Sequence, residues 1–286
     1  MKKILLLTAL VLLITGCSVR EDSAQTSEIS PAVPEPEQIL APQAEAYDLQ
    51  PDPVAGILTI SPGDTLARIA DMLEEMGKIP GFLAAAQEGD FSEFSLIAAM
   101  PGDYNRPFAL EGYLFPGEYN IYQGDSADTV IRRILANTER QITEELRKEI
   151  EGSGFTIDEI IIIASLIETE AMYNPAYMYK VSSVIHNRLN IGMRLQLCET
   201  VFYLRDWVHP FIDGDINRYD EFYCTYTGIS SLPAGPIGNP GLDAIRAALN
   251  PAETDYLFYL FDSDYNYHFA VTYDVHRGNV QRYLGR

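Results

Sequence analysis

The sequence predicts an α+β fold, in which a mostly helical core carries a few antiparallel strands and follows a small β-α module. Apolar residues recur at helical spacing in several segments between residues 126 and 190. Short strand-like runs occupy residues 57–60, 256–261 and 267–272. Residues 21–56 are acidic and rich in proline, which is typical of a segment without a packed core.

The composition limits the functions that the chain can have. Its 286 residues include 41 Asp or Glu and 20 Lys or Arg, which gives a formal net charge of −21. Such an acidic protein repels phosphate backbones, so we expect no nucleic acid partner. The length suits one or two domains, and 3 cysteines are too few for a disulfide-rich scaffold. No stretch reaches the roughly 20 apolar residues of a membrane-spanning helix.

The first 16 residues have the pattern of a signal peptide. A basic start precedes an apolar run over residues 4–14 and two small residues directly before Cys17. This pattern resembles a bacterial lipobox, which implies cleavage before Cys17 and lipid attachment to its sulfur. Ordinary secretion with Cys17 incidental, or an uncleaved anchor, is the alternative. We expect a lipid-anchored protein on the extracytoplasmic side of the cell membrane, facing the cell wall or periplasm.

Residues 17–56 are predicted to be a disordered tether that begins at the lipidated cysteine. From residue 21 to residue 56 the chain has six prolines, eight acidic residues and no Lys or Arg. Such a segment buries too little apolar surface to offset its ordering entropy. Proline and like charges extend it, so it is expected to hold the folded part away from the membrane.

A small β-α module is expected over residues 57–105. Its first residues have the pattern of a strand, a turn and a helix with Asp64 as the N-cap. The stretch from residue 60 to residue 70 resembles the opening of a LysM-type glycan-binding module, and an ordinary β-turn-α unit is the alternative. The strand, the turn and three helices are expected at residues 57–60, 61–64, 66–73, 82–86 and 91–97.

The second predicted domain, residues 106–286, is mainly helical. Residues 111–119 are aromatic and contain turn residues, so we expect a loop packed on the core. An amphipathic helix is predicted over residues 126–151, ended by glycines. Two further helices are expected at 156–172 and 177–190. Another helix is expected to start with Asn239 as its N-cap and Pro240 as its first residue. Two strands at 256–261 and 267–272 are expected to form a hairpin.

The helix that begins after Thr156 is the most informative segment. Thr156 and Glu159 have the pattern of a capping box, so the start of the helix is well defined. At about 100° per residue from Ile157, Glu168 falls at about 20°, inside the apolar arc, and Glu170 falls at about 220°, on the polar side. We therefore expect Glu168 to be buried and Glu170 to face water.

Burial of Glu168 has a chemical consequence. A carboxyl group in an apolar setting holds its proton more tightly. It then stays protonated near neutral pH, as a general acid for glycosidic cleavage must. The alternative is a structural glutamate at the helix end that forms a salt bridge with Arg188 or Arg194.

An ordered series of motifs runs through the chain from about residue 57 to its end. The segments are EGYLFP at 111–116, ASLIETEA at 164–171, VSSVIHNRLNIGMRLQ at 181–196, ETV at 199–201, YCTY at 223–226, LPAGPIGNPG at 232–241, AIRAALNP at 244–251 and YLFY at 256–259. Together they resemble the endolytic murein transglycosylase (YceG-like) family, although no single segment is specific. The family often has Asn where this chain has Cys224, which affects fine substrate contacts. A lipobox and tether stand in place of the family's usual N-terminal membrane helix.

The resemblance implies a lytic transglycosylase that cuts inside peptidoglycan glycan strands. It implies cleavage of the β-1,4 bond from N-acetylmuramic acid (MurNAc) to N-acetylglucosamine (GlcNAc), with 1,6-anhydro-MurNAc ends, as strands are terminated or trimmed. It also implies that Glu168 is the catalytic acid, the residue that the helical wheel selects separately, while Glu170 assists electrostatically. No metal or cofactor is needed. The implied partners are peptidoglycan strands, the membrane through the lipid anchor, and cell-wall synthases.

Gln196, Thr200, Tyr226 and Asn239 are the predicted substrate contacts. Gln and Tyr side chains hydrogen-bond N-acetyl and hydroxyl groups, and a tyrosine ring offers a face to a sugar. The N–H groups beside Asn239 are suited to a carboxylate of a peptide stem. For each residue, the alternative is a structural role in a loop or in core packing.

Other functions stay open from the sequence. A hydrolytic muramidase cleaves the same bond with water, and a non-catalytic peptidoglycan-binding lipoprotein or scaffold would keep its cellular role without Glu168. A solute-binding lipoprotein of a transporter shares the lipobox and the acidity but not the motif series. The histidines have no metal-binding spacing. Cys198 and Cys224 either pair or stay free, because spacing alone does not decide.

Overall fold

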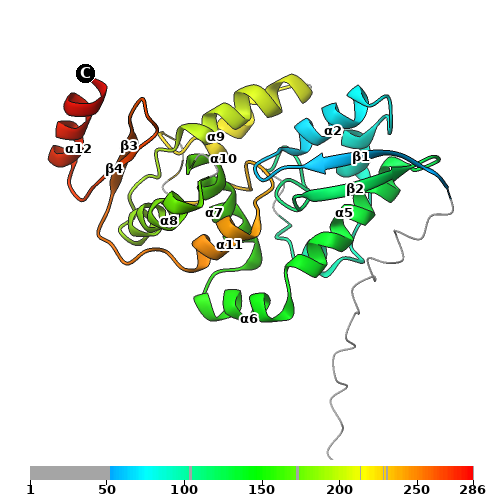
Figure 1. The fold of residues 1–286 in the computed structure, drawn as a ribbon, viewed down its shortest axis with the longest axis horizontal. Coiled ribbons are helices and arrows are strands. Elements are labelled where there is room, and N and C mark those ends of the chain that lie inside the picture. The colour runs from blue at the N-terminus through cyan, green and yellow to red at the C-terminus, as the bar shows by residue number, and fades with distance from the viewer. Residues whose placement is uncertain are drawn as a thin grey trace, which may run out of the picture. The chain divides into compact units, whose positions relative to one another are not determined.

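A computed structural model describes residues 52–102, 105–171, 174–212, 214–227, 229 and 231–285. The predicted signal peptide, Cys17 and most of the predicted tether lie outside these residues. The elements are β1 (Val54–Ile60), α2 (Leu66–Glu75), α3 (Phe82–Glu88), α4 (Ser95–Ala98), β2 (Gly117–Tyr122), α5 (Ala127–Gln141), α6 (Glu144–Ser153), α7 (Ile157–Glu170), α8 (Pro175–Asn190), α9 (Cys198–Tyr203), α10 (Asp220–Tyr223), α11 (Leu242–Leu249), β3 (Phe258–Phe261), β4 (Tyr267–Ala270) and α12 (Tyr273–Asn279) (Figure 1). Short π and 3₁₀ turns lie at Leu204–Val208, His209–Phe211, Ile216–Tyr219 and Val280–Leu284. The α+β class predicted from the sequence is confirmed.

Strand β1 begins three residues earlier than predicted, so residues 54–56 belong to this strand and not to the tether. Its partner strand is one that the sequence did not predict. β2 runs antiparallel to it, with Leu58 opposite Tyr119. Tyr119 and Ile121 are buried on one face of β2, while the residues between them are exposed, which is the usual period of a half-buried strand. The prediction of a loop over residues 111–119 is therefore wrong for its last three residues. The pairing crosses residue 105, and the structure does not confirm a LysM-type module.

The helix that follows β1 starts at Leu66 as predicted, but its N-cap is not Asp64. Thr65 is its N-cap, and the Thr65 side chain accepts the N–H of Arg68. Asp64 instead accepts the N–H of Ser61 at 2.7 Å within the preceding turn. Both residue types suit an N-cap, so the composition did not separate them.

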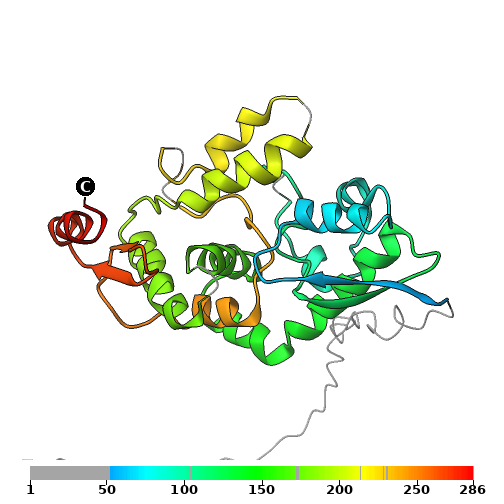
Figure 2. The ribbon, with the colours of Figure 1, turned by 45° about the horizontal axis from the view of Figure 1, so that its top comes forward.

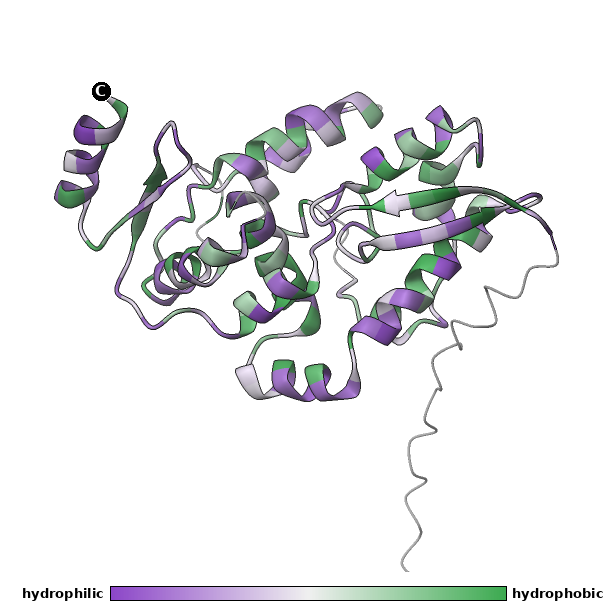
Figure 3. Ribbon diagram, viewed as in Figure 1, coloured by the Kyte–Doolittle hydropathy of each residue, from purple (hydrophilic) through white to green (hydrophobic). Residues whose placement is uncertain are grey.

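The long helix predicted over residues 126–151 is two helices. α5 ends at Gln141, and α6 begins after Thr143, whose side chain accepts the N–H of Leu146. Glu144 and Glu145 occupy the first turn of α6, where acidic side chains are favourable. Both helices carry hydrophilic and hydrophobic residues (Figure 3), so the apolar stripe alone did not reveal the break.

Helix α7 lies at the centre of the described chain. Helices α8 and α11 lie beside α7 in both views of the ribbon (Figures 1 and 2). Residues 160–164 of α7 are all buried, which is the pattern of a helix enclosed on most sides. Its last turn, with Glu168, is thus held by neighbours that come later in the sequence.

The C-terminal hairpin is present as predicted. β3 and β4 are antiparallel, with Tyr259 opposite Phe269. The helix α12 after it was not predicted, and the three elements lie together at the C-terminal end in Figure 1. Among the residues that the structure describes, no helix is long and apolar enough to cross a membrane.

Candidate active site

Helix α7 carries the predicted acid in its last turn. Thr156 and Glu159 form the expected capping box. Glu168 is 3% exposed, so the burial that the helical wheel predicts is confirmed. Arg188 and Arg194 donate to backbone carbonyls. The alternative ion pair with Glu168 does not form among the described residues.

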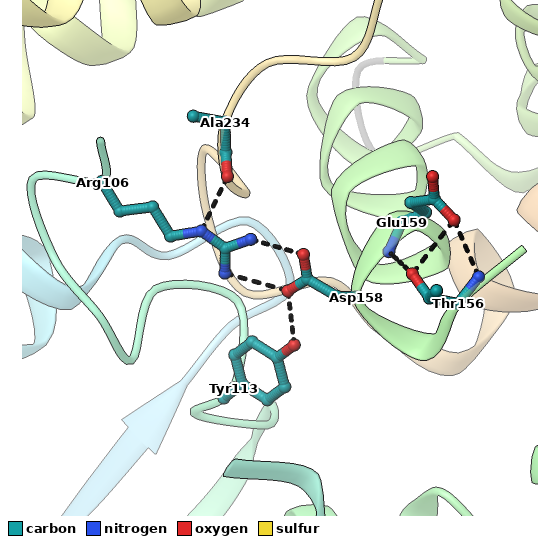
Figure 4. Close-up of polar contacts among 6 residues, drawn as sticks. All are labelled: Arg106, Tyr113, Thr156, Asp158, Glu159 and Ala234. Carbon is teal, nitrogen blue, oxygen red and sulfur yellow. Dashed lines mark hydrogen bonds and ion pairs between the residues drawn. The ribbon is translucent and has the colours of Figure 1, made fainter. Parts of the chain in front are cut away.

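A buried ion pair fixes the other end of α7 (Figure 4). Arg106 donates two hydrogen bonds to the Asp158 carboxylate, one of them at 2.9 Å, and a third to the Ala234 carbonyl at 2.7 Å. The Tyr113 hydroxyl donates to the same carboxylate at 2.6 Å. Because the side chains of Arg106 and Asp158 are 6% and 8% exposed, this network joins α7 firmly to the loops on both sides of it.

Glu168 opens onto a cleft of about 520 Å³. Its Oε2 atom accepts the backbone N–H of Gly241 at 2.9 Å. Burial raises the pKa of Glu168 above its ordinary value of 4.5, and Asp243 adds to the rise, while the hydrogen bond from Gly241 opposes it. The volume is in the range of a small-molecule or saccharide site. The cleft is also lined by Ser61, Pro62 and Asp64 before α2, Pro175 and Met178 of α8, and Leu242 of α11.

Glu170 is not on the water-facing side that the helical wheel predicts. Its Oε2 atom accepts the Tyr259 hydroxyl at 2.6 Å, and its Oε1 atom is shielded from solvent. The Tyr267 hydroxyl donates to the Glu170 carbonyl at 2.5 Å. Burial is the main cause that raises the pKa of Glu170 to about 7. The prediction failed because the β3–β4 hairpin covers this side of α7.

Gln196 and Tyr226 lie at the surface, on two segments of the chain that are joined by a backbone hydrogen bond. Gln196 is exposed and has a positive φ of 52°, and its N–H donates to the Thr225 carbonyl at 3.1 Å. Tyr226 is 38% exposed, and its hydroxyl lies 2.9 Å from the Cys198 sulfur. Both side chains are accessible to a ligand, although neither is among the residues that line the Glu168 cleft.

Thr200 and Asn239 are both 0% exposed, so neither side chain offers a surface to a substrate. The Thr200 hydroxyl donates to the Leu197 carbonyl at 3.0 Å. Asn239 is not the N-cap of α11, which is Gly241. Its side chain accepts the Leu114 N–H at 2.7 Å and is fully used in tying loops together, as described below. Contact of these two residues with substrate therefore stays a prediction, and the structure shows both side chains bonded within the protein.

Neither of the two described cysteines, Cys198 and Cys224, is in a disulfide. Cys198 is exposed, and the Cys224 sulfur lies 3.3 Å from the Thr227 hydroxyl. The disulfide left open by the sequence is therefore not formed in this structure.

Glu111 is the acidic residue whose importance the sequence analysis missed. It is 1% exposed, and burial raises its pKa to about 8. Its carboxyl accepts the Leu66 N–H at 3.0 Å and the Tyr203 hydroxyl at 3.1 Å. The only signal in the sequence was its position as the first residue of the EGYLFP segment. This position does not reveal its hydrogen-bond partners, Leu66 and Tyr203, because they lie far away in the chain.

A second hollow lies beside the first. It has a volume of about 200 Å³ and is lined by Glu199, Phe202 and Trp207, among others. Gly63 and Thr65 line it too, so the segment before α2 borders both hollows. No group of three or more His, Cys, Asp or Glu is arranged to hold a metal ion in the part of the chain that the structure describes.

Comparisons with known proteins agree with the motif series. The model of the YceG-like family matches residues 36–282. The chain is 28% identical over 265 residues to a protein of Streptococcus pneumoniae strain D39 named endolytic murein transglycosylase, covering 85% of this chain and 47% of that one. It is 33% identical over 176 residues to the Bacillus subtilis protein of the same name, covering 61% and 48%. The chain thus spans about half the length of the curated relatives it matches.

A solved structure is similar as well. The crystal structure of a YceG-like protein from Listeria monocytogenes aligns with a TM-score of 0.66 at 29% sequence identity, over 78% of this chain and 75% of that chain.

Proposed function

This chain belongs to the YceG-like family, and we propose that it is an endolytic lytic transglycosylase that cleaves peptidoglycan glycan strands. Its relatives named endolytic murein transglycosylase support this activity. The bond cleaved would be the β-1,4 link from MurNAc to GlcNAc, and the product would carry a 1,6-anhydro-MurNAc end.

One observation carries the proposal: a buried glutamic acid opens onto a cleft that can hold sugar. Glu168 lines the cleft, and its pKa is raised by burial. A raised pKa keeps a larger fraction of the carboxyl protonated near neutral pH. This is the form that a general acid needs in order to protonate a leaving glycosidic oxygen.

The reaction can proceed through this single carboxyl. Glu168 gives its proton to the oxygen that leaves MurNAc C1, and the C1–O bond breaks. The C6 hydroxyl of the same MurNAc attacks C1 and gives its proton to the Glu168 carboxylate. The acid is restored, and the new C1–O6 bond closes the anhydro ring without a water molecule.

A hydrolytic muramidase is the second candidate, because Asp64 and Asp243 line the same cleft as Glu168. Most glycosidases use two carboxylates, and the second can activate a water molecule or attack the sugar. The two reactions differ in their products. Anhydro ends are lighter than reducing ends by one water.

The test is a digest of purified peptidoglycan by the full-length protein, with the product masses read by mass spectrometry. We expect internal cleavage with anhydro ends. Glu168→Gln should keep the circular dichroism spectrum of the fold and lose at least about a hundredfold in rate, the scale of a general acid. Glu118→Gln, at an exposed position of β2, is the matched control, and Glu170→Gln should keep partial activity. Reducing ends would favour the muramidase, and full activity of Glu168→Gln would refute both enzymes.

We further propose that residues 1–16 are removed, that Cys17 carries lipid, and that residues 17–53 hold the enzyme off the extracytoplasmic face of the membrane. The acidic, proline-rich composition of this segment supports a spacer. Cell-wall synthases are the expected partners in the termination or trimming of nascent strands. Cys17→Ala should move the protein from the membrane fraction to the soluble fraction, and unchanged membrane retention would contradict the anchor.

A further inference from the structure

The segment between β1 and α2 forms a rigid turn at the edge of the Glu168 cleft. The Asp64 N–H donates to the Ser61 carbonyl at 3.0 Å. Pro62 takes the second position of the turn, and Gly63 takes the third with a φ of +85°. This combination is the signature of a type II turn. The conformation of the turn is therefore set by its own four residues. Its position in the protein is set by contacts with other segments.

The turn is joined to the loop before α11 by backbone contacts. The Gly63 N–H donates to the Asn239 carbonyl at 2.8 Å, and the Asn239 N–H donates to the Asp64 carbonyl at 2.9 Å. The Asn239 side-chain amide donates to the same Asp64 carbonyl at 2.8 Å. A Cβ atom on Gly238 would lie 2.7 Å from the Gly63 oxygen, so only glycine permits so close an approach.

Glu111 holds the turn from its buried side. One carboxyl oxygen accepts the N–H of Leu66, two residues after the turn, at 3.0 Å and lies 3.5 Å from the Asn239 amide nitrogen. The other accepts the Tyr203 hydroxyl at 3.1 Å. One buried side chain therefore connects the start of α2, the loop before α11 and α9. Tyr223 is a further titratable group near it.

Pro62 brings the turn to the acid itself. A Cβ atom on Gly241 would lie 3.4 Å from the Pro62 ring and 3.5 Å from Glu168 Oε2. Gly241 is the residue whose N–H binds that oxygen. The Pro62 ring thus packs beside the hydrogen bond of Glu168 and excludes water from one side of it. Exclusion of water is the main cause of the raised pKa of Glu168.

We propose that the Ser61–Asp64 turn is part of the catalytic centre, and that Glu111 and Asn239 are positioning residues that hold it over Glu168. This inference rests on the proposed function. The turn then serves both as a wall for the sugar and as the cover that keeps the acid protonated. The N-terminal segment is part of the reaction site rather than a separate glycan-binding module.

Gly238→Ala is the sharpest test, because the added methyl pushes the turn away without changing Glu111, Asn239 or Glu168. Gly152→Ala is the matched control, since a Cβ atom there meets nothing within 4 Å. We expect Gly238→Ala to lower the rate at saturating glycan about tenfold or more. The alkaline limb of its pH–rate profile should move to lower pH, because water that reaches Glu168 lowers the pKa of its carboxyl. The other charged groups that line the cleft are Asp64, which moves with the turn, and Asp243, which keeps its place in α11. A rate and a pH profile equal to those of Gly152→Ala would overturn the proposal.

Glu111 gives a second, separate test. Glu111→Ala should reduce the rate about tenfold or more and speed amide hydrogen exchange in the peptide that contains residues 61–66. Glu111→Gln keeps an acceptor for the Leu66 N–H and should recover most of that rate. A Glu111→Ala protein with faster exchange in the turn but a normal rate would overturn the proposal, as would a Gln variant no better than Ala. Failure of the wild-type protein to release fragments would instead refute the proposed function.

Discussion

The buried carboxyl of Glu111 should make the protein less stable as the pH rises. Its pKa is about 8 in the folded state, against an ordinary value of 4.5. Folding therefore favours the protonated form of this group. Its contribution to stability is fully present below pH 4.5 and is lost as the pH rises through about 8. Glu170, with a pKa of about 7, acts in the same direction.

The size of the effect follows from the two pKa values. The difference between 4.5 and about 8 corresponds to a total of about 5 kcal/mol. On the order of 3 kcal/mol of this should be lost between pH 5 and pH 8 by the same relation. For a folded unit of this size, 1 kcal/mol changes the melting temperature by about 2–4 °C. Glu111 alone should therefore lower the melting temperature by about 10 °C over that pH range.

Urea unfolding of wild type and Glu111→Gln between pH 5 and pH 8 tests this reasoning. The neutral amide resembles the protonated acid, so the variant should lose less stability with pH than the wild type, by the 3 kcal/mol or so given by linkage. Glu118→Gln, which removes one exposed carboxylate, should keep the wild-type slope. Equal slopes in wild type and Glu111→Gln would refute a protonated Glu111. The difference between the two proteins cancels the contributions of Glu170 and other groups.

Two further predictions concern the ends of α7. Arg106→Ala leaves the Asp158 carboxylate buried without its cation and should lower the free energy of unfolding by about 3–5 kcal/mol in a urea titration. Arg205→Ala breaks an exposed ion pair and should lower it much less. Equal losses in the two variants would contradict the buried network. Tyr259→Phe removes the hydrogen bond that lowers the pKa of Glu170, so this pKa should rise above about 7 in a ¹³C carboxyl NMR titration, and an unchanged midpoint would contradict the contact.

Local signals in the sequence were enough for the central helix and the acid within it. The capping box at Thr156 and the apolar arc both depend on residues close together in the chain, and both are present in the structure. The burial of Glu168 followed from the arc alone. The break between α5 and α6 was harder to predict because apolar residues continue across it. Its local sign in the sequence is Thr143, an N-cap residue followed by two glutamates at the start of α6.

Features that depend on distant residues were missed. Glu170 has a polar position on the helical wheel, but a hairpin about 90 residues later buries its carboxyl. The sequence did not predict β2, and its first three residues were assigned to a loop, because its partner strand lies on the far side of three helices in the sequence. Asn239 and Thr200 have side chains that suit a ligand, and in the structure both are buried and hydrogen-bonded to the protein's own backbone. The sequence shows such residues, but it does not show which residues surround them in the fold and so determine their role.

The contact between Asp64 and Asn239 spans 175 positions of the chain. A ribosome synthesises Asp64 long before Asn239, and contacts so distant form late because a large loop must close first. The cleft is therefore assembled only after the chain has been made beyond residue 241. A shorter nascent chain has Glu168 but not the wall that Gly241 and Leu242 provide, so the chemistry of the cleft cannot begin before that point.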